Sequence, residues 1–248
     1  IGSGSLAAED DGDRNTAIGT QALAAQTGTS GEVHNTAVGW HVGYNITTAV
    51  DNTLMGSEAG DALNTGGKNS VFGKGALSNA TTASGSVAIG HEAGRSISTG
   101  NNNIAIGEDA LNGGTTTGDN NIAIGTDAGN ALTSGNENVF IGTDAGGTTT
   151  AGTNIVAIGR NAAAANITTD GSYSVFIGGL AGNQITSGIG NVAIGYAALD
   201  AEDDGDYNTA IGYEALTDQT GVSGEVSNVA VGYRAGTNIT TGIRNTIV

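Results

Sequence analysis

The chain is patterned by short apolar triplets, each of which closes on a glycine and is followed by mostly polar residues, as in NTAIG (15–19) and NVAIG (191–195). Such a segment is rich in β-branched residues and too short for a helix, so it predicts a strand of about five residues. The closing glycines are Gly2, Gly19, Gly39, Gly56, Gly73, Gly90, Gly107, Gly125, Gly142, Gly159, Gly178, Gly195, Gly212 and Gly232. Most of these glycines lie 17 residues apart, and the longest interval is 20 residues.

A second apolar position in each unit lies in a segment of the type I-T-T-G or I-T-S-G, as at Ile46 and Ile185. This segment predicts a second short strand, which leads into a turn rich in Gly, Asn, Asp and Ser. Two short strands and two turns in about 17 residues form one coil of a solenoid. We therefore expect an all-β fold, a parallel β-solenoid of about 14 coils, in which residues 1–248 form a single repetitive domain.

The first strand is apolar on both faces. Val192 and Ile194 share one face, because strand side chains alternate, and Ala193 lies on the other. A single solenoid has only one interior, so the second apolar face requires another surface to cover it. We expect close self-association through the small residues, in the form of a parallel homotrimer. The alternative is a monomeric solenoid whose alanines face a turn.

The segments NTAIGYEAL (208–216), SVAIGHEAG (86–94) and NVAIGYAAL (191–199) resemble known repeats. They are similar to the head repeats of trimeric autotransporter adhesins, which wind a parallel β-roll in a homotrimer. They also resemble the repeats of phage-type tail fibres and of related bacterial fibre proteins. Adhesin heads use about 14 or 15 residues per coil, whereas 17 dominates here. The resemblance implies a fibre shaft used for attachment, located extracellularly on a cell or virion surface.

Composition limits the partners and the chemistry. The chain has 7 basic and 24 acidic residues, a net charge of -17, no Pro and no Cys. Such a charge repels nucleic acid and anionic lipid, and no segment is apolar enough to insert into a membrane. The three histidines, His34, His41 and His91, are scattered and are expected to be solvated. We therefore expect no catalytic residues and no enzyme activity.

Two acidic turns stand out. The stretch AEDDGDRNTAIG (8–19) returns as AEDDGDYNTAIG (201–212). Clustered carboxylates on a Gly-containing turn are candidate calcium ligands, although the spacing differs from that of an EF-hand. The candidate metal ligands are Asp10, Asp11, Asp13, Asp203, Asp204 and Asp206. Calcium is the only cofactor that the sequence suggests, and a solvated turn without an ion is the alternative.

Alignment of the units places Glu9 and Glu202 at the position that Ile185 occupies, so that a carboxylate enters a column of apolar residues. The next unit has Gln26 or Gln219 at this position. Stacked Glu and Gln side chains could form hydrogen bonds between adjacent coils, which would offset the cost of burial. Alternatively, the chain turns outward at these coils and neither carboxylate is buried.

Surface chemistry offers two further candidates. Four N-x-T sequons could carry sugar, at Asn45, Asn79, Asn166 and Asn238. Four aromatic residues directly follow a closing glycine and could stack on sugar rings, namely Trp40, Tyr196, Tyr213 and Tyr233. Because Tyr196, Tyr213 and Tyr233 belong to consecutive units, we expect them to form one column.

A longer repeat overlies the coils. Residues 1–55 align without gaps on residues 194–248, with 34 of the 55 positions identical, at an offset of 193 residues. This repeat favours a segment of a longer fibre, or a subunit that stacks end to end in a filament. The expected function is a structural fibre or adhesin shaft. The alternative is a glycan-binding, lectin-like fibre or a glycosylated extracellular filament subunit, with surface glycans as additional partners.

Overall fold

The structure is a computed structural model that describes residues 1–10, 12–27, 31–168, 172–220 and 223–248. The chain divides into two compact units, residues 1–120 and residues 121–248. Each unit is a stack of similar coils, and the described residues of both units together make about 13 turns of a parallel β-solenoid without helices. The predicted fold class is therefore confirmed. Among the described residues, no helical segment has the length and apolar character that a membrane crossing would need.

In the first unit, one short strand per coil forms a parallel sheet in the order β8-β7-β6-β5-β4-β2. The strands of this unit are β1 (Gly12–Asp13), β2 (Thr16–Ile18), β3 (Gly31–Glu32), β4 (Thr36–Val38), β5 (Thr53–Met55), β6 (Ser70–Phe72), β7 (Val87–Ile89) and β8 (Ile104–Ile106). Strands β1 and β3 form a separate two-stranded parallel sheet.

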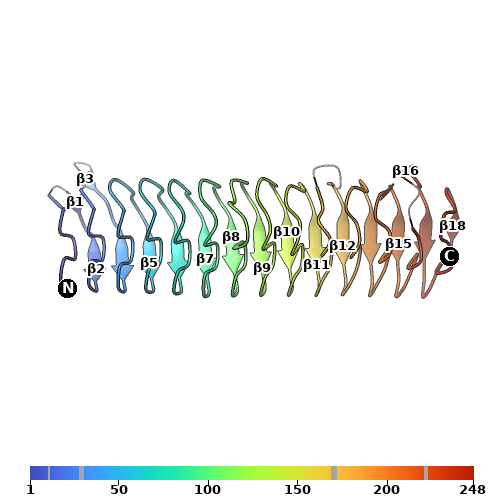
Figure 1. The fold of residues 1–248 in the computed structure, drawn as a ribbon, viewed down its shortest axis with the longest axis horizontal. Coiled ribbons are helices and arrows are strands. Elements are labelled where there is room, and N and C mark those ends of the chain that lie inside the picture. Colours follow the sequence, from blue (N-terminus) through green and yellow to red (C-terminus); the bar gives the residue numbers. More distant parts are fainter. Residues whose placement is uncertain (11, 28–30, 169–171, 221–222) are drawn as a thin grey trace. The chain divides into compact units, whose positions relative to one another are not determined.

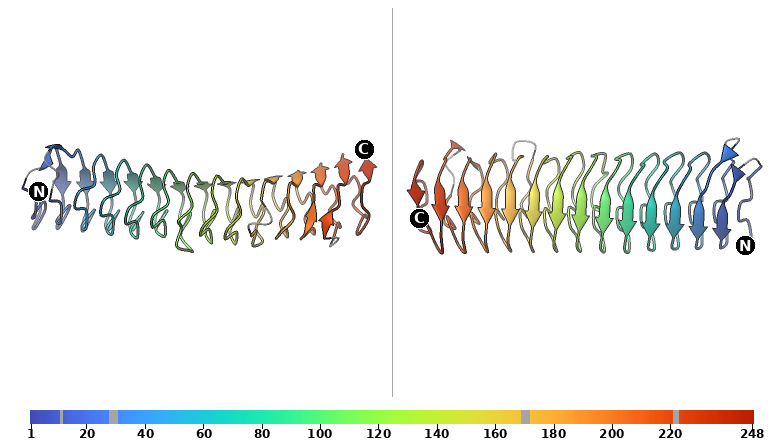
Figure 2. Two further views of the ribbon diagram at one scale, coloured as in Figure 1. Left: turned by 90° about the horizontal axis from the view of Figure 1, so that it is seen from above. Right: turned by 180° about the vertical axis from the view of Figure 1, so that it is seen from behind.

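In the second unit, the corresponding sheet has the order β18-β17-β15-β13-β12-β11-β10-β9, and β14 pairs with β16. The strands are β9 (Ile122–Ile124), β10 (Val139–Ile141), β11 (Val156–Ile158), β12 (Val175–Ile177), β13 (Val192–Ile194), β14 (Gly205–Asp206), β15 (Thr209–Ile211), β16 (Gly224–Glu225), β17 (Val229–Val231) and β18 (Thr246–Ile247). Figure 2 shows the strands of each unit along one side of the coils and the connecting loops on the other.

The predicted second strand of each coil does not form a regular strand in the described residues. Its Thr-rich segment consists of bends, although the coils still bond there: the Thr47 N–H donates to the Asn64 carbonyl at 3.1 Å. One isolated parallel bridge, Ile97 to Thr116, also occurs. One or two hydrogen bonds per pair of coils, flanked by turns, do not make a ladder long enough for a regular strand. The prediction of a second strand was wrong, while the coil itself is as expected.

The closing glycines stack directly on one another from coil to coil within each unit. Gly56 has a φ of 137°, a region that other residues rarely adopt, and an added Cβ would lie 2.4 Å from the carbonyl oxygen of Gly73. A side chain here would therefore require both a strained backbone and a separation of the coils. Close backbone stacking explains why glycine recurs at this position.

A largely buried column of asparagines lies beside the glycines, four residues before most of them; the exceptions are Ser86, Ile155 and Ser174. Asn52 is typical: its N–H donates to Asn35 Oδ1 at 2.9 Å, and its Nδ2 donates to the Gly66 carbonyl at 3.1 Å. In the second unit, the Asn138 N–H donates to Asn121 Oδ1 at 3.1 Å. Each side chain thus satisfies buried backbone groups of its own coil and of the next coil, which is how buried polar groups avoid a desolvation penalty.

Large and small residues alternate inside the coils. The middle residue of each strand is buried, and it is usually alanine. Where it is Phe140 or Phe176, the position six residues later is Gly146 or Gly182, and an added Cβ on Gly146 would lie 2.6 Å from Phe140 Cδ1. Where the middle residue is Ala193, the position six residues later is the buried Leu199. In these coils a large strand residue is matched by glycine and a small one by leucine, whereas Ala88 with Gly94 combines two small residues.

Candidate functional site: outer strand face, acidic turns and aromatic edge

The outer face of the strands has an apolar row in both units, formed by the third strand residue, while the first residue is Thr or Ser in β2, β4, β5 and β6. The first and third residues of each strand point away from the core, as the alternating burial of β7 and β13 shows. The exposed third-position side chains are Ile18, Met55, Phe72 and Ile89 in the first unit and Ile194, Ile211 and Val231 in the second. The small alanines are buried instead, so the expectation of association through small residues was wrong. The larger β-branched residues form the uncovered apolar face.

The second acidic turn has its glutamate inside the coil. Glu202 is completely buried, and its Oε1 accepts hydrogen bonds from the N–H groups of Asp203, Asp204 and Gly205 at 3.1, 3.3 and 2.9 Å. Burial raises the pKa of Glu202, and these three N–H groups partly counter that effect. Of the two expected arrangements, the buried one is therefore correct at Glu202.

Glu9 and the two glutamines at the corresponding position join the asparagine column. Asn228 Nδ2 donates to Gln219 Oε1 at 2.6 Å, and Asn35 Nδ2 donates to Gln26 Oε1 at 2.9 Å. In the first acidic turn, Asn15 Nδ2 donates to Glu9 Oε2 at 3.0 Å. These glutamate and glutamine side chains have a structural role, as acceptors for asparagine.

The matching atoms of the second acidic turn, Glu202 Oε2 and Asn208 Nδ2, are both buried, and neither has a partner among the described residues. At the equivalent positions of the first acidic turn, Asn15 and Glu9 are bonded to each other.

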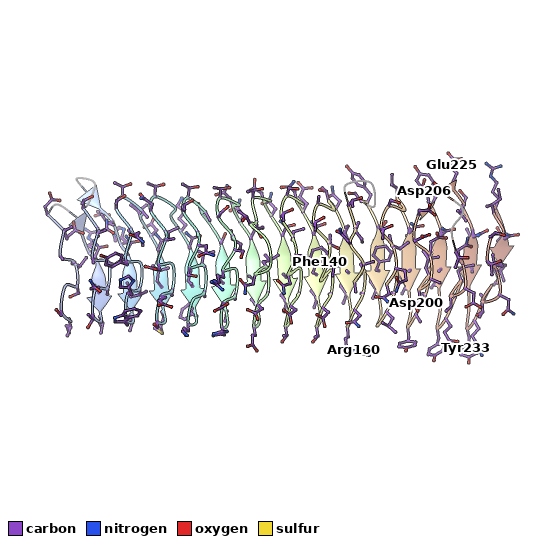
Figure 3. The ribbon with its side chains drawn as sticks, in the orientation of Figure 1. Phe140, Arg160, Asp200, Asp206, Glu225 and Tyr233 are labelled. Atoms are coloured by element: carbon purple, nitrogen blue, oxygen red, sulfur yellow. The ribbon has the colours of Figure 1, made fainter. Side chains whose placement is uncertain are left out.

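Each acidic turn also carries an additional short strand, which pairs with the following coil of 20 residues. Strand β14 pairs with β16, with Asp206 opposite Glu225, and both side chains lie on the same edge of the coils (Figure 3). The carboxylate of Asp206 accepts a hydrogen bond from the Ile189 N–H at 2.8 Å. The equivalent pair in the first unit, β1 and β3, places Asp13 opposite Glu32. These additional strands were not expected from the sequence.

The candidate calcium ligands are only partly brought together. Carboxylate oxygens of Glu202, Asp203 and Asp204 lie within 4.8 Å of one another, whereas Asp206 is bonded to the backbone of the preceding coil. Burial, and then repulsion from Asp203, raises the pKa of Asp204. In the first turn, Asp10 is exposed and Asp11 lies outside the described residues. Calcium binding at these turns remains a prediction.

The three tyrosines form the expected column on one edge of the second unit. The ring centroids of Tyr196 and Tyr213 are 5.3 Å apart, and those of Tyr213 and Tyr233 are 5.5 Å apart, with interplanar angles of 21° and 18°. Their side chains remain exposed, at 45%, 45% and 74%. A hydrogen bond and charge repulsion from Glu214 raise the pKa of the Tyr213 hydroxyl.

Trp40 belongs to a different aromatic group, in the first unit. His41 stacks between Trp40 and Tyr44, with centroid separations of 4.8 and 3.9 Å, and its Nδ1 lies 3.1 Å from Asp61 Oδ1. Burial raises the pKa of Asp61, while His41 lowers it. The expectation that the histidines are freely solvated was therefore wrong for His41, because neither the stacking nor the aspartate 20 residues away is evident from the sequence.

The four sequon asparagines are exposed. They lie six or seven residues after a closing glycine, and their exposure leaves room for a sugar. Asn45 donates from Nδ2 to the Asp61 carbonyl at 2.9 Å, and Asn166 accepts from the Thr150 hydroxyl at 2.9 Å. Asn79 and Asn238 occupy the same position in their own coils as Asn45, six residues after the closing glycine. Their glycosylation remains a prediction.

A shallow cavity of about 400 Å³ lies in the second unit. It is lined by Asp127, Asn130, Asp144, Gly147, Thr148, Asn161 and Ala164. The cavity forms where Gly147 and Ala164 replace the larger residues of neighbouring coils, such as Asn130. The carboxylate of Asp127 is already occupied by Asn130 Nδ2, which donates to it at 2.7 Å.

The fold and these surfaces define a β-solenoid repeat protein. No family model, curated protein or solved structure matches the chain in the three comparisons that were made.

Proposed function

We propose that the chain is a structural shaft that associates with copies of itself through the outer faces of its strands. The observation that carries this proposal is the apolar outer face, on which side chains such as Ile89 (40% exposed) and Ile194 (36% exposed) recur at each coil. Contiguous exposed apolar residues of this kind mark association sites in soluble proteins. The regular parallel stacking favours identical copies in the same orientation, and three copies are expected.

Several features support a shaft rather than an enzyme. The coils repeat with little variation. The residues that recur inside them, glycine, asparagine and alanine, allow one coil to pack closely on the next. The resemblance to adhesin heads and tail fibres supports a place on a cell or virion surface, where the shaft presents an attachment site to a host or substrate.

The proposal is tested by the mass of the assembly in solution. Ile89→Lys and Ile194→Lys each place a charge on the outer face, and together they should convert a trimer into single chains, because a buried unpaired charge costs several kcal/mol. Light scattering coupled to size exclusion measures the mass. Thr82→Lys and Gln184→Lys, at exposed loop positions, are the matched controls and should leave the trimer intact. A wild-type protein that runs as a single chain at all concentrations would contradict the proposal.

A second candidate function is glycan binding at the aromatic edge. The observation that favours it is the column of Tyr196, Tyr213 and Tyr233, whose rings stack and yet stay exposed. Exposed aromatic faces pair with the apolar faces of sugar rings while the sugar hydroxyls remain in water. The two candidates are compatible, because the outer strand face and the aromatic edge are different surfaces of the same coils.

A further inference from the structure

The tyrosine column stops at a glycine that the backbone does not require. Arg160, Gly179 and Tyr196 each directly follow a closing glycine, so they occupy the same position in three successive coils. Gly179 does not have a left-handed backbone, and an added Cβ would meet its nearest neighbours, Tyr196 Cδ2 and the Arg160 carbonyl oxygen, at 3.6 and 3.8 Å. These are ordinary contacts, so a side chain would fit. Its absence leaves one level of the edge empty.

Backbone hydrogen bonds fix the three levels. The Leu180 N–H donates to the Arg160 carbonyl at 3.0 Å, and the Ala197 N–H donates to the Gly179 carbonyl at 2.9 Å. Parallel strands are spaced about 4.8 Å apart, so Arg160 and Tyr196 are separated by roughly 9.6 Å across the empty level. A flat ring placed at the empty level would then lie about as far from the Tyr196 ring as the Tyr213 ring does on the other side, where the centroids are 5.3 Å apart. We call the space between Arg160 and Tyr196 the Gly179 slot.

The two walls of the slot differ in chemistry. One face of the Tyr196 ring is covered by Tyr213, and the opposite face is turned toward the empty level. Arg160 is exposed, lies on the same edge as Tyr233 (Figure 3), and has no ion-pair partner among the described residues. The slot therefore offers an apolar ring face on one side and an unpaired guanidinium on the other.

We propose that the Gly179 slot binds the pyranose ring of an acidic sugar, with its apolar face on Tyr196 and its carboxylate on Arg160. A guanidinium pairs with a carboxylate through two parallel hydrogen bonds, which fixes the orientation of the ring. The open side of the slot keeps the sugar hydroxyls in water. This inference rests on the glycan-binding candidate and names its ligand class; it does not depend on the shaft proposal.

The charge of the chain restricts the ligand further. At a net charge of -17 the protein repels polyanions, and Arg160 is the one cation at this position in the three coils that form the slot. A glycan with a single acidic sugar therefore fits better than an acidic polysaccharide. Binding should weaken as salt rises, because the ion pair is exposed.

The test uses the full chain and saturation-transfer NMR, which observes the sugar and tolerates a large assembly. Methyl β-D-glucuronide should bind in the millimolar range, with transfer concentrated on one face of the ring, and methyl β-D-glucoside should bind at least tenfold more weakly. Gly179→Tyr fills the slot and should weaken glucuronide binding at least tenfold while circular dichroism and melting stay unchanged. Arg160→Gln should reduce glucuronide binding to the level of the glucoside.

The controls separate the slot from other surfaces. Ser57→Tyr adds a ring at the same coil position in the first unit, and Arg95→Gln removes a different exposed arginine; both should leave binding unchanged. Undiminished binding in Gly179→Tyr, or no binding of the glucuronide by the wild type, overturns the proposal. Binding of benzoate without the glucuronide overturns the assignment to a sugar. If Tyr233→Ala abolishes binding and Gly179→Tyr does not, glycan binding holds but the slot is wrong.

Discussion

At the scale of single residues, the coil depends on backbone conformations that side chains normally avoid. In the coil around Gly56, Asp51 and Glu58 both have a φ of 60°, and Gly60 has a φ of 59°. For residues other than glycine, asparagine and aspartate this region costs roughly 1–2 kcal/mol, so Glu58 bears the strain here. Each of these N–H groups donates to a carbonyl of a neighbouring coil, at 2.8–2.9 Å. The strained backbone conformation thus occurs where it aligns an N–H group for a hydrogen bond to a neighbouring coil.

Glu202 gives a prediction at this scale. Its folded pKa is raised by burial, above an ordinary value of 4.5, so its favourable contribution is complete below that value and is lost as the pH rises through the folded pKa. Glu202→Gln removes the charge and introduces the residue that Gln219 already provides in the next coil. The variant should melt higher than the wild type at pH 8 and equally at pH 4. A gain of ~1 kcal/mol corresponds to about 2–4 °C for a chain of this size.

The control for Glu202→Gln is Glu225→Gln, which removes an acid of the following coil whose side chain is 71% exposed. Its melting temperature should follow that of the wild type at both pH values. If Glu202→Gln lowers the melting temperature at pH 8, the buried carboxylate stabilises the coil by its charge, and the interpretation given above is incorrect.

At the scale of elements, the core depends on pairs of positions within one coil. Phe140 fills the space that Gly146 leaves, whereas in several coils whose strand has alanine or valine the position of Gly146 is leucine, as at Leu77 and Leu111. These leucines adopt a φ of 53°, close to the 60° of Gly146, so the backbone accepts leucine there. Phenylalanine in the strand therefore requires glycine at this turn position.

This pairing predicts a rescue. Phe140→Ala should cost about 3–5 kcal/mol, as large-to-small substitutions in cores do. Gly146→Leu alone should also destabilise, because Phe140 leaves no room for it. The double variant Phe140→Ala with Gly146→Leu should recover about 1–2 kcal/mol relative to the sum of the single effects, measured by urea unfolding.

The mismatched pair provides the control. Phe140→Ala combined with Gly182→Leu affects two different coils, since Gly182 contacts Phe176, and the two effects should simply add. Equal behaviour of the matched and mismatched pairs would show that the volumes of strand and turn are not coupled.

Some features of the elements could be predicted from the sequence and others could not. The period of 17 and the strand before each glycine follow from composition and spacing, and both are confirmed. The direction of the strand faces could not be read, because Ala193 and its neighbours Val192 and Ile194 are all apolar. Only the packing in the structure shows that the middle residue of the strand, which is usually alanine, is the one that faces the narrow interior. The tyrosine column was predictable, whereas the gap at Gly179 was hidden among the many glycines.

At the scale of the whole molecule, each coil contacts only its neighbours within its unit, which predicts tolerance to the loss of a complete coil. Deleting residues 74–90 joins Gly73 to His91 and removes 17 residues, one full period. The shortened protein should keep the circular dichroism of the wild type and unfold cooperatively, with a melting temperature lower by a few degrees.

Deleting residues 74–88 is the control, because it removes two residues fewer and places Ile89 beside Gly73. The glycine and asparagine columns then lose their register, and the variant should aggregate or unfold at a much lower temperature. Equal stability of the two deletions would mean that the coils do not depend on a fixed register.

The hydrogen bonds that join the coils within each unit have a mechanical consequence. They run from one coil to the next, along the direction in which the coils stack, so a pull in that direction loads the bonds of one coil at a time. Each coil that detaches would release a loop of about 17 residues, or roughly 60 Å of extended chain. We expect a solenoid built in this way to yield in small repeated steps and to lengthen under tension before it breaks.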